Sequence, residues 1–400
     1  MTTTESLAGL VEEITVGHRG GYDTRSHMEH AAQQAKERNY QDIFIADIDA
    51  HHYEREAWAD IIKYIEDPVL RHRAEGRDRQ GRPVELFAGA PSNQDISGRI
   101  LRYPRRYMEK TPEEETREIV LVRRMMEAIG IDVQIVFPTP MLVLGLHPDP
   151  WMEVQLSWAY TRWMTEEILP HEPRMKTMVY LPFNEPSACL RAIEEFSDRQ
   201  GVAGYMVTSP RFAPVHHNDY MPVYDAIQER GMPLAFHGGF NRMERLFEGM
   251  NRFLSVHSLG FVISNMVHLT NLIVNGIPER FPELKIVMIE SGLAWLPFMM
   301  QRLDNNYSMR SSEAPLLTKK PSEYMQSNFF YSTQPIEDGN LEALEMTMKM
   351  IKAETQLMFS SDYPHWDFNL PSTIYDLPFL SHEQKLAILG ENARRVFKFD

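Results

Sequence analysis

The sequence predicts a (β/α)₈ barrel with an N-terminal extension and a long insertion after the first strand. Eight short runs rich in Val, Ile and Phe alternate with longer amphipathic stretches between residues 43 and 362. The runs are almost continuously apolar, which is typical of parallel strands covered on both faces. A strand followed by a helix, repeated around a closed barrel, leaves no strand edge exposed.

The boundaries of the elements follow from where the apolar runs begin and end. Strands are expected at residues 43–50, 131–138, 175–183, 202–208, 232–239, 284–290, 327–333 and 356–362. Helices are expected at 113–129, 151–168, 186–198, 219–230, 262–275, 294–309 and 339–353. Pro186 suits the first turn of its helix, because proline lacks the N–H group that this turn leaves unbonded.

Two parts of the chain exceed a minimal barrel. Residues 1–41 are expected to form a partly helical extension, and residues 42–400 the barrel domain. Within the barrel domain, residues 55–112 are rich in Arg, Asp, Gly and Pro and predict an insertion at the C-terminal face, where such insertions commonly cover active sites. Residues 209–261 add loop length on the same face.

The composition narrows the classes of partner. The net charge of −15 argues against nucleic acid and anionic membranes, because both bind basic surfaces. Cys189 is the single cysteine, which excludes an intrachain disulfide and a thiolate metal cluster. No continuous apolar run reaches the roughly 18 residues of a membrane span, and no signal peptide is recognisable. We therefore expect a cytoplasmic protein with a small-molecule substrate.

The candidate reactive residues stand at the ends of three predicted strands. Asp49 and His51 are two residues apart, so they share one face of the first strand. His237 ends the fifth strand and Asp362 the eighth, and the C-terminal ends of all strands meet at one mouth of a barrel. Two imidazoles and two carboxylates suit one divalent metal ion, Zn²⁺ first and Mn²⁺ next. The alternative is a set of hydrogen-bonded core residues, and the shared strand-end position favours the metal.

Several motifs resemble those of a known family. They are ADIDAHHYE, FHGG, NGIPERFPELKIVMIESGLAWLPFMMQRLD, FSSDYPHWD and LSHEQKLAILGENARRVFKFD. With them, residues 42–400 resemble the amidohydrolase superfamily, in the branch related to aminocarboxymuconate semialdehyde decarboxylase. The resemblance implies a metal-dependent barrel, a homo-oligomer, and metal ligands at Asp49, His51, His237 and Asp362. Relatives of this branch include nonoxidative decarboxylases of aromatic or muconate-type acids, C–C bond hydrolases and other hydrolases.

Two positions depart from the pattern of that branch. Asp49 stands where the best-characterised decarboxylase has histidine, which makes the expected metal site more anionic. Glu290 stands where the family has its strand-six catalytic histidine. A carboxylate there can act as a general base if burial raises its pKa, but it cannot supply the positive charge of an imidazolium. His257, expected on the loop after the fifth strand, is the best substitute for the missing imidazole.

Other polar residues have more than one interpretation. His365 either supports the metal site from outside or faces the substrate, and Glu54 could hydrogen-bond a ligand histidine. His268 falls within an apolar helix and is expected to be a core residue. A basic run is expected to be solvated, or else to hold one arginine that binds a substrate carboxylate; its members are Arg99, Arg102, Arg105 and Arg106.

The leading functional hypothesis is a metal-dependent hydrolase that cleaves an amide, ester or activated C–C bond of a small aromatic or unsaturated substrate. A metal-bound water would be the nucleophile. Asp362 would bind the metal and take the proton of the water, and Glu290 or His257 would relay it to the leaving group. The alternatives are a nonoxidative decarboxylase of an aromatic or muconate-type acid and a noncatalytic ligand-binding barrel.

Overall fold

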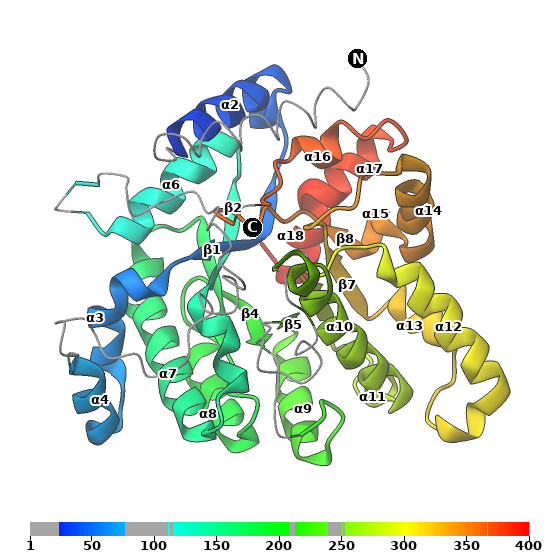
Figure 1. Ribbon diagram of the computed structural model, residues 1–400, viewed down its shortest axis with the longest axis horizontal. Coiled ribbons are helices and arrows are strands. Elements are labelled where there is room, and N and C mark those ends of the chain that lie inside the picture. The colour runs from blue at the N-terminus through cyan, green and yellow to red at the C-terminus, as the bar shows by residue number, and fades with distance from the viewer. Residues whose placement is uncertain are drawn as a thin grey trace.

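Eight parallel strands lie in sequential order from β1 to β8 in one sheet. The structure is a computed structural model that describes residues 24–76, 111–112, 115–208, 213–238, 250, 253–365 and 367–399. The strands are β1 (Ala46–His52), β2 (Val133–Pro138), β3 (Met175–Tyr180), β4 (Val202–Val207), β5 (Leu234–His237), β6 (Ile286–Ile289), β7 (Phe329–Ser332) and β8 (Leu357–Met358). Figure 1 shows the strands at the centre with helices around them. The predicted (β/α)₈ barrel is confirmed.

The first and last strands meet through backbone hydrogen bonds rather than a regular ladder. Ile48 N–H donates to Phe359 O at 3.1 Å, and Asp362 N–H donates to Asp49 O at 2.7 Å. The ladder of β8 is shorter than the expected 356–362, since it ends at Met358. The chain beyond it still runs beside β1 and turns at Asp362, whose φ is 58°. The junction between the first and last strands, the seam of the barrel, therefore lies at Asp49 and Asp362, two of the predicted metal ligands.

The helices follow the strands around the barrel. The longer ones are α2 (Thr24–Glu37), α4 (Pro68–Glu75), α6 (Arg117–Ile129), α7 (Pro150–Trp163), α8 (Pro186–Phe196), α9 (Met221–Arg230), α10 (Phe253–Val274), α12 (Trp295–Arg310) and α14 (Leu341–Ile351). The shorter ones are α3 (Trp58–Ile61), α11 (Ile277–Arg280), α13 (Pro321–Met325), α15 (Ala353–Gln356), α16 (Ser372–Tyr375), α17 (His382–Leu386) and α18 (Asn392–Phe397). Turns of π-helix lie at Met164–Ile168 and Ala387–Glu391.

Local sequence explains several helix boundaries. Asp149 accepts a hydrogen bond from Trp151 N–H at the start of α7, with Pro150 in the first turn. Gly130 ends α6 with a φ of 83°, a left-handed conformation that glycine adopts without a steric penalty. α10 begins at Phe253 rather than at the expected 262. His257 therefore lies on this helix and not on a loop, so that expectation was wrong.

Close backbone contact joins the C-terminal segment to the first strand. Gly390, in the π-helical turn Ala387–Glu391, packs against the carbonyl oxygen of Phe44, just before β1. A Cβ atom at this glycine would collide with that oxygen. Phe359 N–H also donates to Ile388 O at 2.8 Å. The end of the chain thus closes the N-terminal side of the barrel seam.

Parts of the predicted extension and insertion lie outside the described residues. The described part of the extension contains α2, which packs against α6 and buries Ala31. The insertion starts with α3 and α4, while residues 77–110 fall outside the described ranges. The four arginines of the basic run lie in that segment. The proposed domain division remains a prediction of the sequence.

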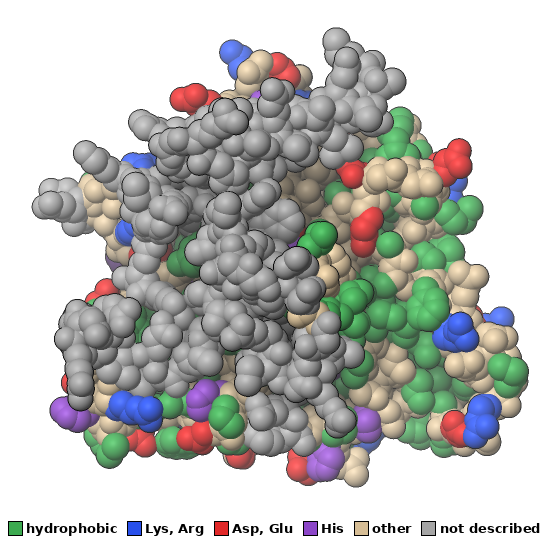
Figure 2. Space-filling model, viewed as in Figure 1, with side chains coloured by type: hydrophobic (Ala, Val, Ile, Leu, Met, Phe, Trp, Pro, Cys, Tyr) green, Lys and Arg blue, Asp and Glu red, His purple; other side chains and the backbone are tan. Residues whose placement is uncertain are grey.

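Among the described residues, one helix is long and apolar enough to cross a membrane. It is the segment Leu254–Val274 of α10, with a mean hydropathy of 1.2 and 44% of its window buried. Core helices of barrels meet the same criterion, and Leu269, Leu272 and Ile273 of this helix are fully buried. Figure 2 shows hydrophobic side chains gathered on the side of the molecule where α10 and α12 lie. Val267 of α10 and Phe298 of α12 are exposed.

Candidate metal centre and catalytic site

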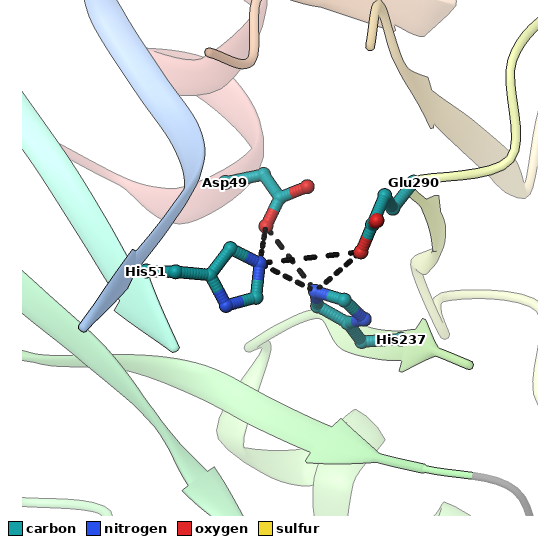
Figure 3. Close-up of side chains that lie close together, drawn as sticks. All are labelled: Asp49, His51, His237 and Glu290. Atoms are coloured by element: carbon teal, nitrogen blue, oxygen red, sulfur yellow. Dashed lines mark hydrogen bonds and ion pairs between the residues drawn. The ribbon is translucent and has the colours of Figure 1, made fainter. Parts of the chain in front are cut away.

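Four buried side chains from β1, β5 and the end of β6 point toward one another (Figure 3). His51 Nε2 and His237 Nε2 lie 3.2 Å apart. Asp49 Oδ1 lies 3.3 Å from each of these nitrogens. Glu290 Oε2 lies 3.5 Å from His237 Nε2 and 4.0 Å from His51 Nε2. Their ligand atoms are all within 4.8 Å of one another, the spacing that one metal ion can span.

Asp362, in the segment that follows β8, joins this group through His51. Its Oδ1 lies 3.2 Å from His51 Nε2 and 2.7 Å from His365 Nδ1. His51, Glu290, Asp362 and His365 form a second set whose ligand atoms lie within 4.8 Å of one another. The structure thus brings five of the six sequence-predicted site residues into one buried cluster, and adds His365 to them. The sixth, His257, lies apart.

The donor set fits a divalent cation. The oxygens of Asp49 and Asp362, and Oε2 of Glu290, are buried, and among the described residues the imidazoles of the cluster are their polar neighbours. Buried carboxylates cost several kcal/mol each unless a cation or a proton compensates their charge. The imidazole nitrogens that contact these oxygens face the same point. This chemistry matches a site with mixed carboxylate and imidazole ligands.

The carboxyl groups of the cluster differ in the direction in which their pKa values are shifted. Burial raises the pKa of Asp49, but the opposing attraction of His237 and His51 leaves it lowered. The pKa of Asp362 is lowered too, because the attraction of His365 and His51 outweighs the effect of burial. The pKa of Glu290 is raised well above its usual value by burial and by the nearby charges of Asp362 and Asp49. Glu290 is therefore the carboxyl group of this cluster most inclined to hold a proton.

A carboxylate beneath the cluster ties three strands together. Asp47 Oδ1 accepts hydrogen bonds from the N–H groups of Asp49, at 3.1 Å, and Ser361, at 2.8 Å. Its Oδ2 accepts from Gln134 Nε2 at 2.7 Å and from Ser361 Oγ at 2.6 Å. Asp47 thereby fixes the backbone beside Asp49 and Asp362. Burial nevertheless raises the pKa of Asp47 to about 7.

The last residue of β2 orients the imidazole of His51. His51 Nδ1 lies 3.1 Å from Pro138 O, and because a carbonyl only accepts, this nitrogen carries a proton. In the neutral ring, Nε2 then presents its lone pair to the cluster. Glu54 accepts hydrogen bonds from the N–H groups of Thr139, at 2.9 Å, and Met141, at 2.6 Å. Glu54 thus holds the loop that follows β2, and the suggestion that it bonds a ligand histidine stays a prediction of the sequence.

His257 faces a buried carboxyl group at the edge of the site. On α10, its Nε2 lies 3.6 Å from Asp367 Oδ2. Burial and the charge of Asp362 raise the pKa of Asp367 to about 8, and Asp367 in turn contributes to the raised pKa of Glu290. His268 lies farther along α10 against Phe236, and burial lowers its pKa to about 4, as expected for a core histidine.

Sequence reasoning missed the supporting residues Asp367 and Asn265. Asp47 could be placed on the same face as Asp49 and His51, because it alternates with them along the strand. Asp367 lies in the SDYPHWD segment, but nothing in the spacing distinguishes it. Asn265 is an amide within the apolar stretch of α10, and a buried polar residue in such a helix requires a hydrogen-bond partner.

Comparison with known proteins identifies the family. The family model described as Amidohydrolase matches residues 46–399, from β1 to the end of the described chain. The chain belongs to the amidohydrolase family. The family resemblance inferred from the sequence is confirmed, as is the expectation of an enzyme.

Similar members of this family and of its fold are decarboxylases. Gamma-resorcylate decarboxylase of Rhizobium sp. (strain MTP-10005) is 22% identical over 292 residues, covering 69% of this chain and 86% of that protein. The structure of 5-carboxyvanillate decarboxylase from Sphingomonas paucimobilis has a TM-score of 0.63 and 22% identity, covering 90% of this chain and 100% of that one. A dihydroxybenzoic acid decarboxylase from Polaromonas sp. JS666, with bound manganese and the inhibitor 2-nitroresorcinol, has a TM-score of 0.63 and 18% identity, covering 89% and 97%.

Proposed function

We propose that this amidohydrolase-family enzyme is a metal-dependent nonoxidative decarboxylase of a hydroxylated aromatic acid. The observation that carries the proposal is Glu290, a buried carboxyl group with a raised pKa beside the two histidines of the cluster. Decarboxylation needs a proton donor beside the metal site, because the ring carbon that loses CO₂ must gain a proton. The decarboxylases among the relatives support this reaction over the hydrolysis favoured by the sequence alone.

Four residues would hold the cation: Asp49, His51, His237 and Asp362. Asp49 and Asp362 are the carboxylates nearest His51 Nε2, at 3.3 and 3.2 Å, whereas Glu290 lies 4.0 Å away. Glu290 Oε2 also lies 3.5 Å from His237 Nε2, so what supports Glu290 as an acid rather than a ligand is its raised pKa. When bound, the cation supplies positive charge that binds and polarises anionic oxygens of the substrate. The carboxylate-rich donor set and the manganese in the Polaromonas structure support Mn²⁺, with Zn²⁺ as its competitor.

The proton path begins at Glu290. Its carboxyl group enters the reaction protonated and donates to the ring carbon, while the electron pair of the broken C–C bond goes to that carbon and CO₂ leaves. In its ionised form Asp367, whose Oδ2 lies 3.6 Å from His257 Nε2, raises the pKa of Glu290 further. His257 therefore acts indirectly in this proposal. Homo-oligomeric assembly and a cytoplasmic location stay predictions of the sequence.

A substrate panel tests this function. Protein reconstituted separately with Mn²⁺ and Zn²⁺ is incubated with hydroxybenzoates and with amide and ester analogues of the same ring. We expect CO₂ release from at least one acid and no incorporation of isotopically labelled water oxygen into the product. Hydrolysis of an analogue with label incorporation, and no CO₂ release, would overturn the proposal in favour of a hydrolase. Elemental analysis of the protein as purified identifies the resident ion.

A further inference from the structure

The backbone conformation of Glu290 is unusual. Its φ is 51°, in the left-handed region that residues with a Cβ atom rarely adopt. Residues stay in such conformations only when the surrounding structure holds them there, and they concentrate at functional sites. A feature of the structure must therefore hold the chain at this position.

The amide of Asn265 holds the residues on both sides of Glu290. From α10, Asn265 Nδ2 donates one hydrogen bond to Ile289 O and one to Ser291 Oγ, each at 3.0 Å. Both hydrogens of the amide nitrogen are thus used. The N–H group of Glu290 itself donates to Ser332 Oγ, on β7, at 3.0 Å. The peptide groups around Glu290 are therefore fixed from two neighbouring elements.

The chain after Glu290 is fixed as well. Glu337 accepts hydrogen bonds from the N–H groups of Leu293, at 2.9 Å, and Ala294, at 3.2 Å. Gly292 has a φ of 64°, and a Cβ atom there would collide with the Glu337 carboxylate. The residues after Glu290 in the loop between β6 and α12 are therefore held in place, so they have little freedom to relieve the strain at Glu290.

Packing alone does not explain an asparagine on this helix. Asn265 is fully buried, and its buried neighbours along α10 are the apolar Phe261 and Leu269 and the core histidine His268. A leucine would fill this space without the desolvation cost of a buried amide. What the amide adds is its pair of hydrogen bonds to the Glu290 segment.

We propose that Asn265 is a positioning residue that holds Glu290 in its left-handed conformation, so that the carboxyl group faces His237. Without the two hydrogen bonds, Glu290 relaxes toward a negative φ and its carboxyl group turns away from the cluster. The expected loss of turnover rests on the proposed role of Glu290 as the acid. The expected displacement of the Glu290 carboxyl group is independent of that role.

Crystal structures test the position directly. We expect Asn265→Ala to show Glu290 at negative φ, with its carboxyl group displaced from His237 relative to the wild type. Asn275→Ala is the matched control, because Asn275 Nδ2 also donates to a backbone carbonyl, that of Asn271, at the far end of α10. The control should leave Glu290 in place. An unmoved Glu290 in Asn265→Ala overturns the proposal. If Asn265→Ala does not fold, Ser291→Ala removes the acceptor of one of the two Asn265 hydrogen bonds, and the same shift of Glu290 is expected and the same unmoved Glu290 overturns the proposal.

A double-mutant cycle tests the effect on catalysis. Because small misplacements of reacting groups are costly, Asn265→Ala should lower kcat by about 10- to 100-fold with little change in KM. In a Glu290→Gln background the same change should alter kcat by less than about twofold, since both act through one group. Additive effects contradict the proposal. If the wild type releases no CO₂ from any acid, the proposed function fails while the crystallographic comparison still decides the role of Asn265.

Discussion

The imidazole rings of His51 and His365 stack with their centroids 4.2 Å apart and an angle of 28° between their planes. His365 also places Nδ1 2.7 Å from Asp362 Oδ1, and its Nε2 lies 3.4 Å from Thr139 Oγ1. It therefore contacts two of the proposed metal ligands, one by stacking and one by an ion pair. This arrangement explains the histidine three residues after Asp362 in the SDYPH segment.

Replacement of His365 should weaken metal binding. Residues that orient metal ligands typically contribute about 10- to 100-fold to affinity, so His365→Ala should raise the Kd for Mn²⁺ by about that factor. Isothermal titration of metal-depleted protein measures the change. His382→Ala, at an exposed histidine of α17, is the control. Equal affinities of His365→Ala and the wild type would contradict a supporting role.

Replacement of Asp362 should abolish both metal retention and turnover. The left-handed φ of 58° at this position is tolerated by asparagine better than by most residues. Asp362→Asn should therefore fold like the wild type while losing one anionic ligand, and Asp362→Ala should lose the ion altogether. Elemental analysis together with circular dichroism separates the loss of metal from misfolding. Full activity in a metal-free variant would refute the assignment.

The acid role of Glu290 predicts a specific pH dependence. Its raised pKa means that the protonated form persists to higher pH than for an ordinary glutamate. Decarboxylation should therefore decline on the alkaline side as this proton is lost, and Glu290→Gln should lower kcat by about 100- to 10,000-fold. Metal content should stay at the wild-type level. A metal-free Glu290→Gln protein would instead identify Glu290 as a ligand.

Much of the fold could be predicted because apolar runs and amphipathic stretches alternate regularly. The exceptions depend on contacts that are distant in the sequence. The ladder of β8 ends at Met358. Beyond it, the backbone of Asp362 bonds to β1, and Ser360 bonds to Thr333, just after β7, through hydroxyl groups. α10 starts at Phe253, within a stretch whose serines and glycine resemble a loop in the sequence.

The site was predictable where strand alternation determines direction. Asp49 and His51 share a face of β1, and His237 ends β5, so the sequence placed these three correctly at one mouth. The sequence could not show that Glu290 turns into the cluster, because this depends on a left-handed φ held by Asn265. It also could not show that His257 faces Asp367 rather than the histidines.

The ion pairs of Glu172 should make stability depend on acidity. Hydrogen bonds from Arg174 and Arg123 lower the pKa of Glu172 to about 2, from an ordinary value of 4.5. Because the pKa of Glu172 is lower in the folded than in the unfolded chain, its ion pairs stabilise the fold at pH values above 4.5. This contribution disappears as the pH falls from 4.5 to about 2. Urea titrations should show Glu172→Gln destabilised near neutral pH and the difference shrinking toward about pH 2. Glu127→Gln, at an exposed residue 3.8 Å from Arg174, should show little pH-dependent change.

A methyl group at Gly390 should destabilise the barrel. It would collide with the carbonyl oxygen of Phe44, which cannot move without disturbing the start of β1. Gly390→Ala should therefore lower the free energy of unfolding by about 1–3 kcal/mol or more. Gly339 has open space around its Cβ position, so Gly339→Ala should be close to neutral. Thermal unfolding of the pair measures the difference, and equal stability would show that the contact can relax.

The hydrogen bond from Asp362 to Asp49 has a consequence for the biogenesis of the enzyme. Asp49 leaves the ribosome among the first residues of the barrel and Asp362 among the last. A nascent chain that has not reached Asp362 can hold at most three of the four proposed ligands. With these four as ligands, a polypeptide that ends before Asp362 should bind the cation less tightly than the full chain.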